Sequence, residues 1–285
     1  LPTEEWPILR SLDFLPGSDF LYQKTLRDPA NINHCVMYYL HIGKKANRSI
    51  RVKTQLFDQM IHEPAFHQLR TKEQLGYIVS SGLQDFATTH GLYFMIQSEM
   101  TSEYLVSRID AFLLAQAAAL RDMPDTVFEK HKGSLINKQL EKLQNLDQET
   151  QRHWEEISNE YYDFEAAQRD VELVRTLTQP MMIDFYTNYI YPKSPTKAKL
   201  VVQLIAQGVD TELKDIKLAN HGPAPVSDGT LPTLITSVRD YKAALAVSAG
   251  ARPVRNLGES LQETSPSERA WTSSRDLEGR LRNIA

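Results

Sequence analysis

The stretch IHEPAFHQLRTKEQLGYIV runs from Ile61 to Val79 and joins two different periodicities of the chain. Before it, Leu56, Phe57 and Met60 combine with Ile61 in the spacing of one apolar helical face. After its glycine, the residues alternate in the manner of a strand. The sequence therefore predicts a helix, a short turn and a strand in direct succession.

The rest of the chain extends this pattern. Strands are expected at 20–25, 35–42, 77–83, 92–97 and 199–205, with the turn-rich DFATTHG joining the third to the fourth. Helices are expected at 48–69 with a kink at Pro64, around 104–113, after Pro124, at 148–162, from 178 to 190, and at 234–245. Hairpin-paired strands and consecutive helices predict an α+β fold with a mostly antiparallel sheet covered by helices.

Composition excludes several classes of function. The 285 residues are 41% hydrophobic and 24% charged, with a net charge of −4, so no nucleic-acid footprint is expected. The longest apolar runs are too short to span a membrane. The first residues, LPTEEWPILR, lack the basic start and apolar core of a signal peptide. A single cysteine, Cys35, suits a reducing compartment, and we expect a cytoplasmic location.

The opening stretch looks like a zinc site but has the wrong spacing. His62 and His67 stand at i and i+5, about 140° apart on a helix, whereas zinc helices place their histidines at i and i+4. His153 begins an HxxE pattern, but Ile157 stands where the second histidine is needed. We therefore expect no metal in this chain.

Other catalytic signatures are missing from the sequence. It has no GxSxG, P-loop or GxGxxG motif. Cys35 lies in an apolar strand, where a buried, inert thiol is expected.

A specific family resemblance begins at the same stretch. HEPAFHQLRTKEQLGYIVSSG followed by GLYFMIQSE resembles the C-terminal part of insulin-degrading enzyme and its fungal pheromone-maturing relatives, the pitrilysin-type inverzincin peptidases. The likeness includes CVMYYLHIG, LTQPMMIDFYTNYI and LVVQLIA, and covers about residues 19–258. Residues 1–18 are interpreted as an inter-domain linker, 208–231 as a long loop, and 259–285 as a polar, mobile tail.

The resemblance implies that the domains of the whole enzyme have different roles. Such enzymes have four related domains of the pitrilysin or mitochondrial-processing-peptidase type, which enclose a chamber; the first carries HxxEH and zinc, and the fourth carries none. The chain resembles the fourth domain. In the family, the arginine and tyrosine that match Arg70 and Tyr77 reach the peptide at the zinc, and the position of Phe66 lines a pocket for a substrate side chain.

The residue chemistry is compatible with these roles. A guanidinium offers fixed donors to peptide carbonyls, and a phenol can donate to the oxyanion of a tetrahedral intermediate. The alternatives are that Arg70 only pairs with an acid such as Glu73, that Tyr77 only packs under the sheet, and that Phe66 is a plain core residue.

Three functional hypotheses follow. In the first, the chain is the non-zinc C-terminal domain of a zinc metalloendopeptidase, inactive alone, with the N-terminal catalytic half and peptide substrates as partners. The chain would then be a fragment or a separate gene product. In the second, it is a stand-alone inert binding or scaffold protein, in monomeric or homodimeric form. The third, an autonomous hydrolase using a histidine cluster, has the least support.

Overall fold

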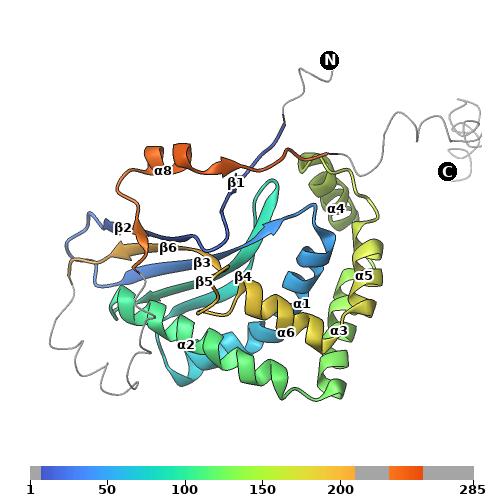
Figure 1. Ribbon diagram of the computed structural model, residues 1–285, viewed down its shortest axis with the longest axis horizontal. Coiled ribbons are helices and arrows are strands. Elements are labelled where there is room, and N and C mark those ends of the chain that lie inside the picture. Colours follow the sequence, from blue (N-terminus) through green and yellow to red (C-terminus); the bar gives the residue numbers. More distant parts are fainter. Residues whose placement is uncertain (1–7, 209–230, 253–285) are drawn as a thin grey trace, which may run out of the picture.

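A six-stranded sheet forms the centre of the protein (Figure 1). The computed structural model describes residues 8–208 and 231–252. The strands are β1 (Leu12–Asp13), β2 (Asp19–Thr25), β3 (His34–Lys44), β4 (Ile78–Asp85), β5 (Thr89–Ser98), β6 (Ala198–Ile205), β7 (Thr233–Leu234) and β8 (Ala246–Val247). The strand order is β4-β5-β3-β6-β2-β7, and β1 pairs with β8 in a separate small sheet.

The sheet is mixed. β4–β5, β5–β3 and β3–β6 are antiparallel, whereas β2 runs parallel to both β6 and β7. The predicted α+β class and antiparallel hairpins are confirmed. β2 and β3 run in opposite directions, and β6 lies between them. Because β6 is antiparallel to β3, it runs parallel to β2.

The helices lie mostly in one block after β5. They are α1 (Arg48–Ala65), the π-helix η2 (Phe66–Lys72), α2 (Ser102–Arg121), α3 (Asp125–Gln139), α4 (Leu146–Ser158), α5 (Ala166–Thr176), α6 (Gln179–Tyr189) and α8 (Val238–Ala244). Asn47 and Thr101 cap α1 and α2, since their side-chain oxygens accept bonds from the amides of Ile50 and Tyr104.

One helix was not predicted. α5 carries Val171 and Val174, which are buried at helical spacing, but only a short apolar stripe accompanies them. α8 is also shorter than predicted, because residues 233–234 join the sheet as β7. The remaining predicted elements are found with small shifts of their ends.

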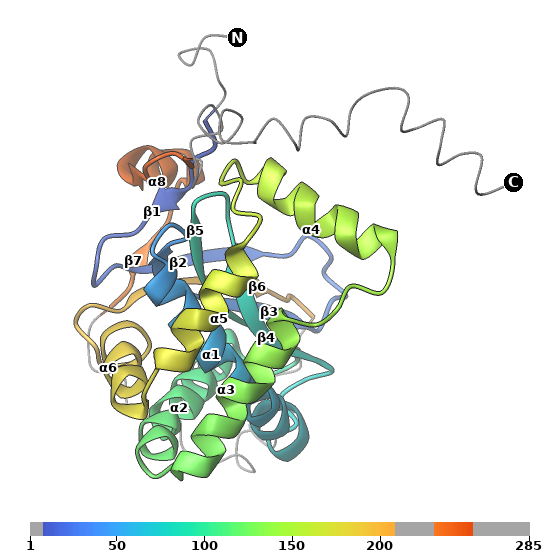
Figure 2. The same ribbon diagram turned by 90° about the vertical axis from the view of Figure 1, so that its right-hand side faces the viewer.

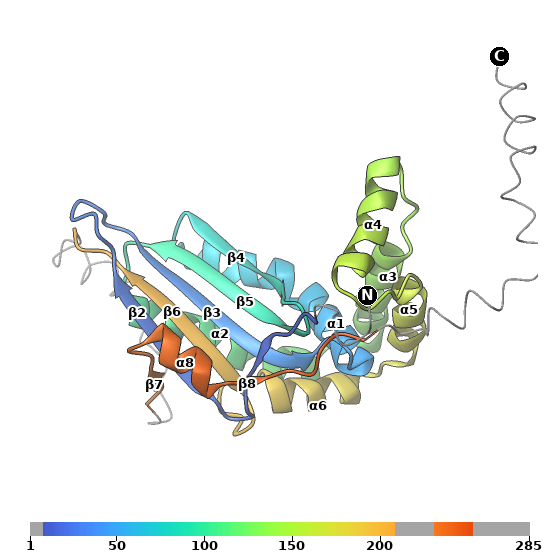
Figure 3. The same ribbon diagram turned by 90° about the horizontal axis from the view of Figure 1, so that it is seen from above.

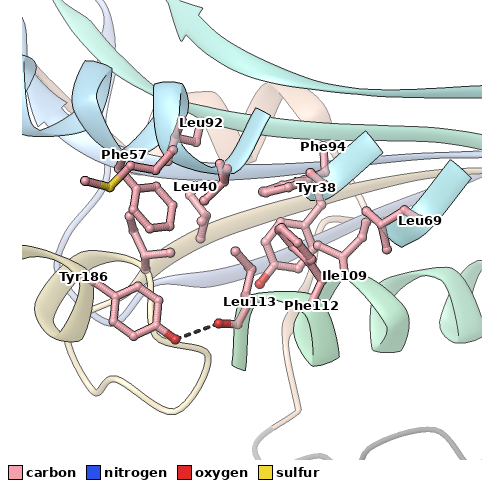
Figure 4. Close-up of a cluster of buried hydrophobic side chains, with 14 of the residues drawn as sticks. Tyr38, Leu40, Phe57, Leu69, Leu92, Phe94, Ile109, Phe112, Leu113 and Tyr186 are labelled. Carbon is pink, nitrogen blue, oxygen red and sulfur yellow. Dashed lines mark hydrogen bonds between the residues drawn. The ribbon is translucent and has the colours of Figure 1, made fainter. Parts of the chain in front are cut away.

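The core lies between the sheet and the helices α1, α2 and α6 (Figure 4). Alternate residues of β3 and β5, such as Tyr38 and Phe94, point into it and are fully buried. The Tyr186 hydroxyl of α6 donates to the Leu113 carbonyl of α2 at 2.7 Å, which joins the two helices. The opposite face of the sheet is partly covered by α8 and β1, while α4 projects from the body (Figure 2).

Several sequence interpretations concern residues at the margins of the structure. β1 lies in the segment interpreted as a linker and pairs with β8. The predicted loop, except for its end residues 208 and 231, and the predicted tail lie outside the described residues. Within residues 8–208 and 231–252, no helix has the length and apolar character needed to cross a membrane.

Candidate functional site

The helical hydrogen bonding changes just beyond Pro64. α1 ends at Ala65 and continues as η2, a π-helix of seven residues, in place of the predicted kink and short helical turn. Proline has no amide hydrogen and crowds the preceding turn, so it weakens the α-helical pattern at this point. π-helical segments occur frequently at functional sites.

A tight turn leads from η2 to β4. The Glu73 amide donates to the Gln68 carbonyl at 2.9 Å, and the Leu75 amide donates to the Leu69 carbonyl at 3.1 Å. Leu69 and Leu75 are both buried, so each end of the turn is anchored in the core. Gln74 has a φ of 49°, a left-handed conformation that costs energy for a residue with a side chain. The surrounding contacts hold this strained turn in place.

Gly76 is required by close packing. A Cβ atom at this position would lie 1.9 Å from the carbonyl oxygen of Gln97 on β5. Only glycine allows the chain to pass this close to β5 before Tyr77.

Glu73 is held by a partner on α2. Its carboxylate accepts two hydrogen bonds from the Arg108 guanidinium, at 2.7 and 2.8 Å, and a third from the side-chain Nε2 of Gln68 at 2.7 Å. The hydrogen bonds to Glu73 raise the pKa of Arg108. The acid considered as a partner for Arg70 therefore forms a bidentate ion pair with a different arginine.

Arg70 and Tyr77 stand together at the turn. The guanidinium carbon of Arg70 lies 6.0 Å from the centroid of the Tyr77 ring. Tyr77 is 88% exposed, so it does not pack under the sheet. Phe66 is 54% exposed at the start of η2 and is not a core residue. The three predicted site residues thus belong to one continuous segment, and all three are accessible, Arg70 partly so.

The two histidines of the opening stretch lie on consecutive helical segments. His62 is in the last turn of α1 and His67 is in η2, and both are exposed. His153 lies on α4, where its ring centroid is 5.7 Å from that of Phe164. Across the described residues, no group of three or more His, Cys, Asp or Glu side chains is arranged to hold a metal ion. The absence of zinc from the whole chain stays a prediction.

Cys35 offers little nucleophilic character. It lies on β3, half-buried, and burial raises the pKa of its thiol. A higher pKa leaves less thiolate at neutral pH.

Sequence reasoning did not identify Arg108. It lies 35 residues from Glu73 and is joined to it only by the fold. No local pattern marks such a pair.

The chain is similar in sequence to one described protein family and to several peptidases. The family described as PQQ synthase PqqF-like, C-terminal lobe domain 4, matches residues 56–154, which include η2, the turn and β4. The A-factor-processing enzyme of Saccharomyces cerevisiae is 36% identical over 250 residues, 87% of this chain and 23% of that enzyme. The insulin-degrading enzyme of Mus musculus is 32% identical over 242 residues, 82% of this chain and 23% of that enzyme. The chain is therefore similar to these peptidases over most of its own length.

The solved structures agree on the fold. The crystal structure of pitrilysin superposes with a TM-score of 0.67 over 86% of this chain and 24% of that one, at 18% identity. The chain spans about a quarter of the length of the curated relatives it matches. Since the matching family model is that of a C-terminal lobe domain, the chain resembles the C-terminal part of pitrilysin-type peptidases.

Proposed function

We propose that this chain is the non-zinc C-terminal domain of a larger zinc metalloendopeptidase. In the whole enzyme it closes the chamber and binds the peptide, and Arg70 and Tyr77 support the transition state. By itself it hydrolyses nothing, because it contributes no zinc-binding motif. The enzyme's N-terminal half is its partner. The observation that carries this proposal is the exposure of Tyr77 beside Arg70 on a strained, anchored turn.

The chemistry assigned to the two side chains follows from their geometry. In zinc peptidases the metal activates water and polarises the scissile carbonyl. Tyr77, as an accessible phenol, can donate a hydrogen bond to the oxygen on which charge develops. Arg70, with several fixed N–H groups, can bind peptide carbonyls and orient the Tyr77 ring beneath its guanidinium.

The rigidity of the turn supports this assignment. Stabilisation of a transition state requires donors that are already in position. Leu69 and Leu75 anchor the turn in the core, and the Glu73–Arg108 ion pair ties it to α2. The backbone at Tyr77 is therefore held in place, although the side chain is exposed.

The decisive experiment compares the full-length parent enzyme with its Tyr77→Phe variant on a quenched fluorescent peptide. The substitution removes one hydroxyl and keeps the ring. We expect turnover to fall by about a hundredfold, the usual effect of removing one oxyanion donor. Zinc content and melting temperature should be unchanged. Turnover equal to that of the wild type would contradict the proposal.

The inactivity of the isolated chain has its own test. We expect no peptide hydrolysis from the chain alone and restored hydrolysis when the N-terminal half is added in trans. Hydrolysis by the chain alone, or no restoration by a correctly folded N-terminal half, would favour the other functional hypotheses.

A further inference from the structure

Helix α2 lies behind the sheet in Figure 3, on the side opposite to α8, and it contacts the π-helix η2. From α2, the side chain of Arg108 reaches Glu73 in the turn after η2. Its Nε donates to Oε2 of Glu73 at 2.7 Å, and its Nη2 donates to Oε1 at 2.8 Å. One guanidinium therefore binds both oxygens of the carboxylate, in the two-pronged geometry that makes such pairs strong.

Glu73 has a second arginine close to it in the chain. Arg70 precedes it by three residues, a distance that a side chain as long as arginine can cover. The side chain of Glu73 is only 9% exposed, so its carboxylate needs a cation more than an exposed carboxylate does. Along the chain, Arg70 is thus the nearest alternative guanidinium for Glu73.

In the structure the two arginines have different partners. Among residues 8–208 and 231–252, no carboxylate pairs with Arg70, and its guanidinium carbon lies 6.0 Å from the centroid of the Tyr77 ring. Glu73 faces α2, whereas Tyr77 is exposed. A guanidinium bound to both oxygens of Glu73 has a fixed position and plane, so it cannot also lie over the Tyr77 ring.

We propose that Arg108 is a positioning residue of the candidate site. By binding both oxygens of Glu73, it prevents Arg70 from pairing with that acid and leaves Arg70 over Tyr77. The effect on turnover rests on the proposed function, but the position of Arg70 can be measured without it. A simple structural tie between η2 and α2 would require Glu73 and Arg108 equally, whereas competition for the acid makes only the loss of Arg108 harmful.

Substitutions of the ion pair separate these two roles. Arg108→Gln removes the cation and leaves the carboxylate of Glu73 to attract Arg70. Glu73→Gln also breaks the ion pair, but Arg70 then has no acid to exchange for Tyr77. The double variant, Arg108→Gln with Glu73→Gln, avoids an unpaired buried charge. The control is Arg121→Gln, which removes the same charge from an exposed position at the end of α2.

The first measurement uses the purified full chain, without zinc and without turnover. The chain carries isotopically labelled arginine and tyrosine, and NMR records the nuclear Overhauser effect between the Arg70 side chain and the Tyr77 ring, identified by its loss in Tyr77→Leu. We expect this effect in the wild type, in Glu73→Gln and in Arg121→Gln. It should disappear in Arg108→Gln and return in the double variant.

The second measurement uses the full-length parent enzyme and the quenched fluorescent peptide. We expect Arg108→Gln to lower kcat/KM by about tenfold or more, and Glu73→Gln and Arg121→Gln to stay within about twofold of the wild type. The double variant should recover to within about twofold as well, because the second substitution removes the competing acid. Such a recovery is not expected of a residue whose role is only structural.

The proposal would be overturned by an Overhauser effect that persists in Arg108→Gln, by its equal loss in Glu73→Gln, or by a double variant that does not regain it. If Arg108→Gln does not fold, Arg108→Lys takes its place. A single ammonium cannot bind both oxygens as a guanidinium does, so the effect should weaken, and an undiminished effect would overturn the proposal.

The outcome for the proposed function is separate. The Overhauser effect involves no turnover, so it is independent of the Tyr77→Phe result in the parent enzyme. If Tyr77→Phe lowers turnover but Arg108→Gln does not, the positioning role of Arg108 is overturned while the proposed function stands.

Discussion

Arg70 lies over the ring of Tyr77, with 6.0 Å between the guanidinium carbon and the ring centroid. This contact joins the third-last residue of η2 to the residue that precedes β4. A guanidinium over an aromatic face is attracted by the ring quadrupole. The cation therefore restricts the directions in which the exposed phenol can point, and the two side chains act as a pair.

Replacing Arg70 should impair both peptide binding and turnover. In the full-length enzyme, we expect Arg70→Ala to lower kcat/KM by about tenfold or more, with a higher KM because donors to the peptide backbone are lost, and a lower kcat because Tyr77 loses the cation that orients its ring. Lys72→Ala is the matched control, because Lys72 is an exposed cation of the same π-helix. Steady-state kinetics on one peptide would measure both. An equal loss in the two variants would indicate a general effect of charge and contradict a specific role for Arg70.

Gly76 gives a test of the turn itself. Gly76→Ala would place a methyl group on the Gln97 carbonyl, so β4 or β5 must shift. We expect a loss in the free energy of unfolding of about 1–3 kcal/mol, the usual effect of overpacking, together with lower turnover in the parent enzyme. Urea unfolding of the purified chain measures the first effect.

Gly133→Ala provides the control for this substitution. Gly133 lies within α3, and a Cβ atom there would meet nothing within 4 Å. Because alanine favours helix over glycine, this variant should gain up to about 1 kcal/mol. If both variants were equally stable, the contact between the turn and β5 would not constrain Gly76.

The sequence predicted the fold better than it predicted the contacts that hold the candidate site in place. The amphipathic face of α1 and the β4–β5 hairpin are local patterns, and both were found as expected. The π-helical form of η2 was not predicted, because Pro64 indicates a weakened α-helix but not the hydrogen-bonding pattern that follows it. The parallel pairing of β2 with β6 involves residues about 180 positions apart, and strand patterns carry no information on partners.

The candidate site shows the same division. Phe66, Arg70 and Tyr77 were identified from a motif, and the structure places them on one segment. Their exposure could not be predicted from residue type, since two of the three are aromatic. The Glu73–Arg108 ion pair joins two residues that are 35 positions apart, so it leaves no periodic pattern in the sequence.

Two tyrosines allow the same chemical change in opposite environments. Tyr186 is buried and donates to the Leu113 carbonyl at 2.7 Å, whereas Tyr77 is 88% exposed. We expect Tyr186→Phe to reduce the free energy of unfolding by about 1 kcal/mol, the net value of one hydrogen bond. Tyr77→Phe should leave it unchanged. Chemical unfolding of both variants checks this, and a destabilised Tyr77→Phe chain would show that its hydroxyl has a structural role.

His90 should make stability depend on pH. Burial lowers its pKa to about 3, and the nearby charges of Arg51, His41 and Lys45 act in the same direction. Its Nε2 lies 3.2 Å from the Thr54 hydroxyl, which itself donates to the Ile50 carbonyl, so Nε2 is the donor to Thr54. Nδ1 is buried without a hydrogen-bond partner among the described residues, so a proton there would have no acceptor.

The sign of the effect follows from linkage. An unfolded histidine binds a proton below about pH 6.5, whereas folded His90 does so only near pH 3. Stability is therefore full above about pH 6.5 and falls as the pH decreases towards 3, by about 2 kcal/mol at about pH 5. In His90→Leu this part of the decrease should disappear, although the lowered pKa values of His41 and His131 leave a remainder. Urea unfolding at about pH 7.5 and about pH 5 measures it. The control is His67→Leu, which changes an exposed histidine and should keep the wild-type decrease in the free energy of unfolding. If His90→Leu showed that same decrease, another group would be responsible for the pH dependence.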